Sequence, residues 1–142
     1  MFLDASAVIA ILGDEADAEH LTAKIDAAQE GFFYSPLSTY EAVIGLTRKM
    51  MVSARRPIKP QLIERAEEIV ENFFSSIGAM EIAITSEITR EAIAATKRYG
   101  RGSGHPAKLN LGDCFAYACA RSTRVPLLFK GNDFSHTDID QV

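Results

Sequence analysis

The sequence has few of the residues on which several protein classes depend. It contains no tryptophan, three histidines and two cysteines among 142 residues, and the cysteines, Cys114 and Cys119, stand five apart in a stretch with a helical pattern. On a helix this spacing holds the two Cα atoms ~8 Å apart on different faces, which is too far for a disulfide. The pair is also poorly placed to bind a metal, so we expect two buried thiols.

Long hydrophobic runs and an excess of positive charge are also missing. The apolar runs are far too short to cross a bilayer, and Asp4 stands where a signal peptide would carry basic residues, so we expect a cytoplasmic protein without a membrane partner. The 15 Lys and Arg face 19 Asp and Glu, a net charge of −4. This balance argues against nucleic-acid binding by bulk electrostatics. It is compatible with a nuclease whose acids surround a metal.

What the sequence does contain is an alternation of β-rich and helical stretches, over a length that suits one domain, 1–142. Strands are expected at residues 1–4, 31–36, 80–84 and 125–131, with a further short one considered at 137–139. Helices are expected at residues 14–28, 37–51, 61–78, 89–100 and 111–123. Strands separated by helices predict an α/β fold with a doubly wound, mostly parallel sheet flanked by helices.

Four carboxylates are expected at one edge of this sheet, because sites in such folds form beyond the carboxyl ends of the strands. Asp4 ends the first strand, and Glu41 lies one turn into the helix after the second. Asp113 opens the helix that follows a Gly-rich loop, and Asp133 follows the fourth strand.

Each of these acids also has a purely structural interpretation. Asp4 suits the N-cap of a helix that begins near Ser6. Glu41 and Asp113 suit the acidic first turn that a helix dipole favours, and Asp133 suits an Asx turn. Asp4, Glu41 and Asp113 are nevertheless flanked by apolar or small residues, which indicates a semi-enclosed edge rather than open solvent.

Converging carboxylates need protons or a positive partner. Two of them ~4 Å apart repel each other by ~1 kcal/mol in water and ~4 kcal/mol near a protein surface. No histidine stands next to any of the four acids, and Lys130 is the only basic residue close to any of them. An all-oxygen donor set suits Mg²⁺ or Mn²⁺ rather than zinc, so the sequence predicts that Asp4 is a metal ligand.

With these residues identified, the chain resembles the VapC-type toxin ribonucleases of the PIN-domain family. The resemblance covers nearly the whole chain. It rests on the opening LDAS with Asp4, on STYEAVIGL with Glu41, on HPAKLNLGDCFAYACA with Asp113, and on the ending PLLFKGNDFSHTDI.

The resemblance implies a PIN-like sheet and a Mg²⁺-dependent endoribonuclease that leaves a 5′-phosphate and a 3′-hydroxyl, with Mn²⁺ as a possible substitute. Asp4, Glu41 and Asp113 carry over as catalytic metal ligands. Many relatives have an acid where this chain has Gly131. Asp133, aided by Asn132, is the best substitute for that acid, and a site of three acids is the alternative.

The small polar residues near the acids have supporting roles in this interpretation. Ser6 and Thr39 resemble the hydroxyl residues that support such sites. Asn110 is expected to orient its loop or a phosphate.

The resemblance also implies partners: an RNA substrate, a second copy in a homodimer, and a cognate antitoxin of the VapB type. An antitoxin arginine would suit the acidic groove. Helix 37–51, with Tyr40 on its apolar side, and the apolar stripe of residues 62–73 are expected to offer a groove for an antitoxin helix. Phe73 and Phe74 are not expected to face one core together, which leaves one of them for a dimer or antitoxin groove.

Two groups of basic residues are candidates for RNA contact. The first comprises Arg48, Lys49, Arg55, Arg56 and Lys59, and the second comprises Lys97, Arg98, Arg101 and Lys108. We favour the second group, because it adjoins the helix that carries Asp113.

Three other functions make demands that this sequence does not meet. A receiver-like signalling domain would need an acidic pair before its phosphoacceptor strand. A phosphatase of the haloacid dehalogenase type would need an acid at the position of Ser6. An inactive, purely protein-binding PIN relative is disfavoured by the retained acids.

Overall fold

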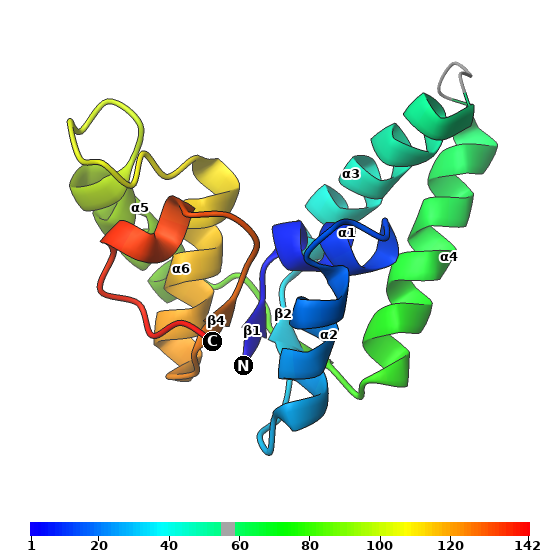
Figure 1. Cartoon of the computed structure of the whole chain (residues 1–142). Helices are drawn as coiled ribbons and strands as arrows, with labels where there is room; N and C mark the ends of the chain where they lie inside the picture. The colour runs from blue at the N-terminus through cyan, green and yellow to red at the C-terminus, as the bar shows by residue number, and fades with distance from the viewer. Residues whose placement is uncertain (55–58) are drawn as a thin grey trace.

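Four short parallel strands form the centre of the computed structural model, which describes residues 1–54 and 59–142 (Figure 1). The strands are β1 (Phe2–Leu3), β2 (Phe33–Tyr34), β3 (Met80–Glu81) and β4 (Leu127–Leu128). Their order in the sheet is β3-β2-β1-β4, and all three pairings are parallel. The chain therefore builds outward from β1 to β3 and then returns to the other side of β1.

Helices connect and flank these strands. They are α1 (Ala5–Leu12), α2 (Ala18–Ala27), α3 (Pro36–Ala54), α4 (Pro60–Ser76), α5 (Ser86–Tyr99) and α6 (Leu111–Thr123), followed after β4 by the 3₁₀ helix η1 (Asp133–His136). The strand considered at residues 137–139 does not form; instead Gln141 makes an isolated parallel bridge to Leu127. No helix in the described part of the chain is long and apolar enough to cross a membrane.

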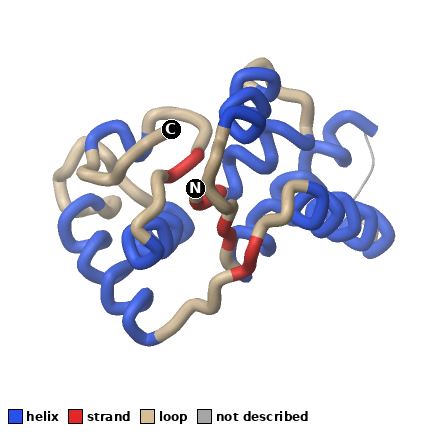
Figure 2. Tube along the Cα trace, turned by 90° about the horizontal axis from the view of Figure 1, so that it is seen from below, coloured by secondary structure: helices blue, strands red, loops and turns tan. Residues whose placement is uncertain are grey.

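Successive residues of the central strands point to opposite faces of the sheet, as the pleat requires. Phe2 and Leu127 pack into a core with α5 and α6, whereas Leu3 and Leu128 pack into a core with α1 to α4. Figure 2 shows the strands lying between these two groups of helices. The doubly wound parallel α/β fold predicted from the sequence is thereby confirmed.

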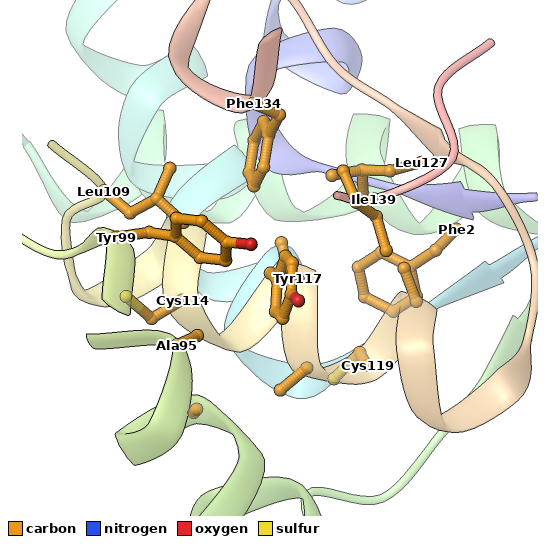
Figure 3. Close-up of a cluster of buried hydrophobic side chains, with 14 of the residues drawn as sticks. Phe2, Ala95, Tyr99, Leu109, Cys114, Tyr117, Cys119, Leu127, Phe134 and Ile139 are labelled. Atoms are coloured by element: carbon orange, nitrogen blue, oxygen red, sulfur yellow. The ribbon is translucent and has the colours of Figure 1, made fainter. Parts of the chain in front are cut away.

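The core that packs against α5 and α6 is built from buried side chains of the strands, of these two helices and of the C-terminal segment (Figure 3). Both cysteines are buried there as free thiols, as expected from their spacing. Tyr117 lies edge-on to Tyr99, with ring centroids 5.6 Å apart, and its hydroxyl donates to Asp138 at 2.6 Å. This bond fastens the C-terminal segment to α6.

The expectation that Phe73 and Phe74 cannot face one core is wrong. Phe74 is buried and stacks on Tyr34 with ring centroids 3.8 Å apart, while Phe73 packs partly buried against the same core. The two rings stand 5.8 Å apart. Adjacent helix positions differ by about 100° in direction, and the apolar side of α4 is wide enough to hold both.

Candidate active site

Asp4 occupies the point where β1 ends and α1 begins. Its backbone N–H donates to Leu128 O of the neighbouring strand at 3.0 Å, so the residue stays registered to the sheet. Its carboxylate Oδ2 accepts from Ser6 N at 2.9 Å and from Ser6 Oγ. Ser6 Oγ in turn accepts from Lys130 N at 3.0 Å, after β4. Asp4 is thus an N-cap of α1, and its buried carboxyl is fixed at the switch point between β1 and β4.

Asp113 is held by a reciprocal cap at the start of α6. Asn110 Oδ1 accepts from Asp113 N at 3.0 Å, and Asp113 Oδ2 accepts from Asn110 N at 2.7 Å. Because both hydrogen bonds are present, the carboxyl cannot swing freely about the end of the helix. Asn110 therefore orients the loop end, one of the two roles expected for it.

Glu41 reaches the same place from the second turn of α3. Its carboxylate lies against Gly112 of α6: a Cβ placed on Gly112 would stand 2.2 and 2.3 Å from Glu41 Oε1 and Oε2. Only a residue without a side chain leaves this space. This contact places the Glu41 carboxylate beside the first turn of α6, which carries Asp113.

One cavity of about 380 Å³ connects these groups. It is lined by Asp4, Ala5, Ser6, Ile9, Tyr40, Glu41, Ile44, Gly45, Arg48, Asn110 and Asp113. Three of the four acids singled out in the sequence therefore share one cavity, although they come from three different helices.

The electrostatics of the cavity disfavour three charged carboxylates. Burial, followed by repulsion from Asp4 and Asp113, raises the pKa of Glu41 to about 7. Burial raises the pKa of Asp113 to about 6, against the hydrogen bond from Asn110, which lowers it. Burial also raises the pKa of Asp4, and the hydrogen bonds from Ser6 oppose that rise. None of the ion pairs among the described residues neutralises these three acids.

Asp133 lies outside the cavity lining. It is an exposed residue at the start of η1, close enough for its charge to raise the pKa of both Asp4 and Asp113. Its neighbour Asn132 makes no side-chain capping hydrogen bond. The structure thus separates Asp133 from the three acids that meet, and its catalytic role stays a prediction.

A divalent cation fits this donor set. As the side chains stand, no three His, Cys, Asp or Glu residues of the described chain form a ready-made metal cage. Mg²⁺ does not need one, since it keeps several of its waters and binds through one or two carboxylates. The carboxyl oxygens of Asp4, Glu41 and Asp113 are hard donors with no competing thiol or imidazole in the cavity lining.

Both groups of basic residues have a member near the acids. Arg48, from the first group, lines the cavity, and the charge of Arg101, from the second group, lowers the pKa of Asp113. Which group contacts RNA stays a prediction. Arg98 of the second group is paired with Asp138 at 3.0 Å. Arg55 and Arg56 lie outside the described residues.

The exposure of the Tyr40 side chain at the cavity was not predicted from the sequence pattern. It shares a helical side with Val43 and Thr47, which are buried, yet Tyr40 itself is 65% exposed and lines the cavity. Its position immediately before Glu41 is the one signal in the sequence that connects it with the site.

Comparison with known proteins agrees with this geometry. The sequence matches the PIN domain family over residues 1–140. It is 42% identical over 139 residues to the VapC ribonuclease R02377 of Rhizobium meliloti (strain 1021), covering 97% of this chain and 98% of that protein. It is also 42% identical over 143 residues to ribonuclease VapC28 of Mycobacterium tuberculosis (strain ATCC 25618 / H37Rv), covering 99% and 96%. The chain therefore belongs to the PIN-domain family, in its VapC ribonuclease group.

Two solved structures share the fold. Mycobacterium tuberculosis VapC20, described as a sarcin-ricin loop cleaving toxin, superposes with a TM-score of 0.74 at 16% identity, covering 99% of this chain and 97% of that one. A toxin–antitoxin complex from Klebsiella pneumoniae gives a TM-score of 0.66 at 17% identity, covering 96% and 92%. The family assignment leaves no place for the receiver-like or dehalogenase-like alternatives.

Proposed function

We propose that the cavity of Asp4, Glu41 and Asp113 is the active site of a Mg²⁺-dependent endoribonuclease, with Mn²⁺ as a substitute metal. The observation that carries the proposal is that three carboxylates, from the N-cap of α1, from α3 and from α6, line one cavity, and none of them forms an ion pair among the described residues. Membership of the VapC ribonuclease group supports RNA as the substrate.

Each side chain has a defined task in this proposal. When bound, the cation supplies charge neutralisation at the phosphodiester and a bound water of lowered pKa. Asp4, held by Ser6, and Asp113, held by Asn110, keep their carboxyl oxygens fixed in the cavity. Glu41, which makes no such capping bond, is the carboxylate best able to orient or deprotonate the attacking water.

The test is cleavage of RNA by the purified protein. We expect activity with Mg²⁺ or Mn²⁺ and none in excess EDTA. Asp4→Asn and Asp113→Asn should abolish cleavage with folding preserved, because asparagine is as good an N-cap as aspartate and keeps one acceptor oxygen. Asp26→Asn, on the exposed side of α2, is the matched control and should cleave normally. Undiminished cleavage in EDTA would reject the metal.

We also propose a cognate antitoxin as a partner, with the chain acting in the cytoplasm and as a homodimer. One arginine of the antitoxin would bind two carboxylate oxygens of the acidic cavity through its planar guanidinium, in place of the cation. A short reading frame beside the gene should therefore yield a protein that copurifies with this chain and suppresses its ribonuclease activity. Copurification with full activity would contradict inhibition at the site, and size-exclusion chromatography of the free chain tests the dimer.

A further inference from the structure

Two of the five large apolar side chains that are exposed in the described residues stand close in sequence to acids of the cavity. Tyr40 is 65% exposed and stands immediately before Glu41, and Leu111 is 70% exposed and stands two residues before Asp113. Tyr40 also lines the cavity itself. The exposed ring of Tyr40 contributes little hydrophobic stabilisation to the fold. Its apolar surface leaves the water only when another molecule covers it.

Arg48 supplies the positive charge on the same helix. It lines the cavity and also a second hollow of about 340 Å³ with Gly13, Lys49 and Val52, so it stands where the two meet. It lies seven residues after Glu41, which is about 10 Å along the helix axis.

Two neighbouring lysines are already neutralised, and Arg48 is not. Glu15 pairs with both Lys49 and Lys130, and Asp17 also pairs with Lys130. None of the ion pairs among the described residues includes Arg48. Arg48 is therefore the cation of the cavity lining that can bind an incoming anion.

A ligand that suits this surface has a flat apolar face and a negatively charged group next to it. Unpaired RNA has both: a base that can stack on a tyrosine ring and a phosphate for a guanidinium. In a duplex the bases are stacked on each other and closed to a side chain. A base stacked on an aromatic ring also needs no particular sequence.

We propose that Tyr40 and Arg48 form a binding strip along α3 for unpaired RNA, in which a base next to the scissile phosphate stacks on Tyr40 and a flanking phosphate binds Arg48. This inference rests on the proposed function of the acidic cavity. It assigns contacts with the substrate to two residues of α3, Tyr40 and Arg48, that are not among the expected metal ligands.

The experiment measures binding separately from cleavage. All proteins carry Asp113→Asn, a change on α6 and not on the helix of the strip, so that the RNA stays intact in Mg²⁺ and every comparison is made within one background. The probe is a fluorescently labelled 12-nucleotide RNA containing one 2-aminopurine, presented either unpaired or as a full duplex. Anisotropy gives Kd, and quenching of the 2-aminopurine fluorescence reports stacking of the base.

For the aromatic half of the strip, Tyr40→Ala should weaken binding of the unpaired RNA roughly 5- to 150-fold and remove the quenching. Tyr40→Phe should restore both, because the ring and not the hydroxyl stacks. Ile93→Ala is the matched control: Ile93 is 51% exposed on α5, so its loss removes exposed apolar surface elsewhere and should change neither signal.

For the cationic half, Arg48→Gln should reduce the slope of log K against log salt by about 0.7, the value for one phosphate contact on a single strand, and leave the quenching in place. Arg90→Gln, an exposed arginine on α5 paired with Glu87, removes the same charge elsewhere and should leave the slope unchanged.

The results separate the two proposals. If the wild-type chain cleaves RNA in a metal-dependent way while Tyr40→Ala binds and quenches like its parent, the strip is refuted and the active site stands. Equal or tighter binding of the duplex, independent of Tyr40, also refutes the strip, as does a Tyr40→Ala defect confined to the antitoxin complex. If the wild-type chain neither cleaves nor binds RNA, both proposals fail.

Discussion

Gly112→Ala should separate activity from stability more cleanly than removal of any acid. Gly112 is buried in the first turn of α6, between Asn110 and Asp113. A Cβ there would stand 2.2, 2.3 and 2.6 Å from Oε1, Oε2 and Cδ of Glu41. The substitution therefore acts on a carboxylate that lies on another helix and stays chemically intact.

The size of the effect follows from these distances. An ordinary contact needs about 3.4 Å, so the Glu41 carboxylate must retreat by about 1 Å or more. It can do so at low energetic cost, because it is the end of a flexible side chain. A misplacement of about 1 Å in an active site can reduce the rate about 10²-fold. The helix itself gains up to about 1 kcal/mol from replacing glycine by alanine, which offsets the cost of the displacement.

We therefore expect Gly112→Ala to melt within a few degrees of the wild type and to cleave RNA about 10²-fold more slowly at saturating Mg²⁺. Gly31→Ala is the control, since its added Cβ would meet nothing closer than 3.8 Å and should change neither property. Wild-type cleavage by Gly112→Ala would refute the role of Glu41 placement. A large fall in melting temperature would show that Gly112 serves packing.

The remaining predictions concern charge. Because the pKa of Glu41 is raised from 4.5 to about 7, the native state binds more protons than the unfolded state between these pH values, and the metal-free protein loses stability as pH rises through that window. Glu41→Gln should therefore match the wild type near pH 4.5. At pH 8 in EDTA it should be more stable by about 1–2 kcal/mol after solvent screening, or a few degrees in melting temperature. Lower stability at both pH values would contradict a Glu41 pKa raised by burial and by the neighbouring acids. Asp133→Asn should reduce cleavage less than Asp113→Asn in the same assay, because Asp133 lies outside the cavity lining and acts on it only through its charge; equal losses would place Asp133 in the catalytic set.

The parts of the fold that depend on local sequence signals, such as helix caps, could be predicted. Helix α6 begins and ends where the sequence predicts, 111–123, because Asn110 caps one end. Helix α5 begins at Ser86, three residues before its predicted start at 89, since Thr85 caps it by accepting from Ile88 N. The strands are two residues each, shorter than predicted, because pairing with a neighbour decides where a strand ends and periodicity does not report it.

The site was predictable because topology brings distant residues together by rule. The carboxyl ends of β1 and β4 meet at the switch point, and Asp4 follows directly from that arrangement. The exposure of Tyr40 could not be predicted, because helical periodicity gives the side of a helix but not where along its length the core stops. The contact of Glu41 with Gly112 likewise depends on how closely α3 and α6 approach, which no local pattern in the sequence expresses.

For Asp4 and Asp113, the sequence presents helix capping and metal binding as alternatives. The observed geometry is compatible with both. A cap needs a carboxyl oxygen at a helix N-terminus, where unpaired N–H groups and the helix dipole stabilise negative charge. The hydrogen bonds from Ser6 and Asn110 each lower the pKa of the carboxyl they meet, against the burial that raises it. Glu41 has no cap, and its pKa of about 7 lies above the value of about 6 for Asp113. Hydrogen bonds therefore fix the carboxyls of Asp4 and Asp113 in the cavity, whereas the carboxyl of Glu41 is placed by its approach to Gly112.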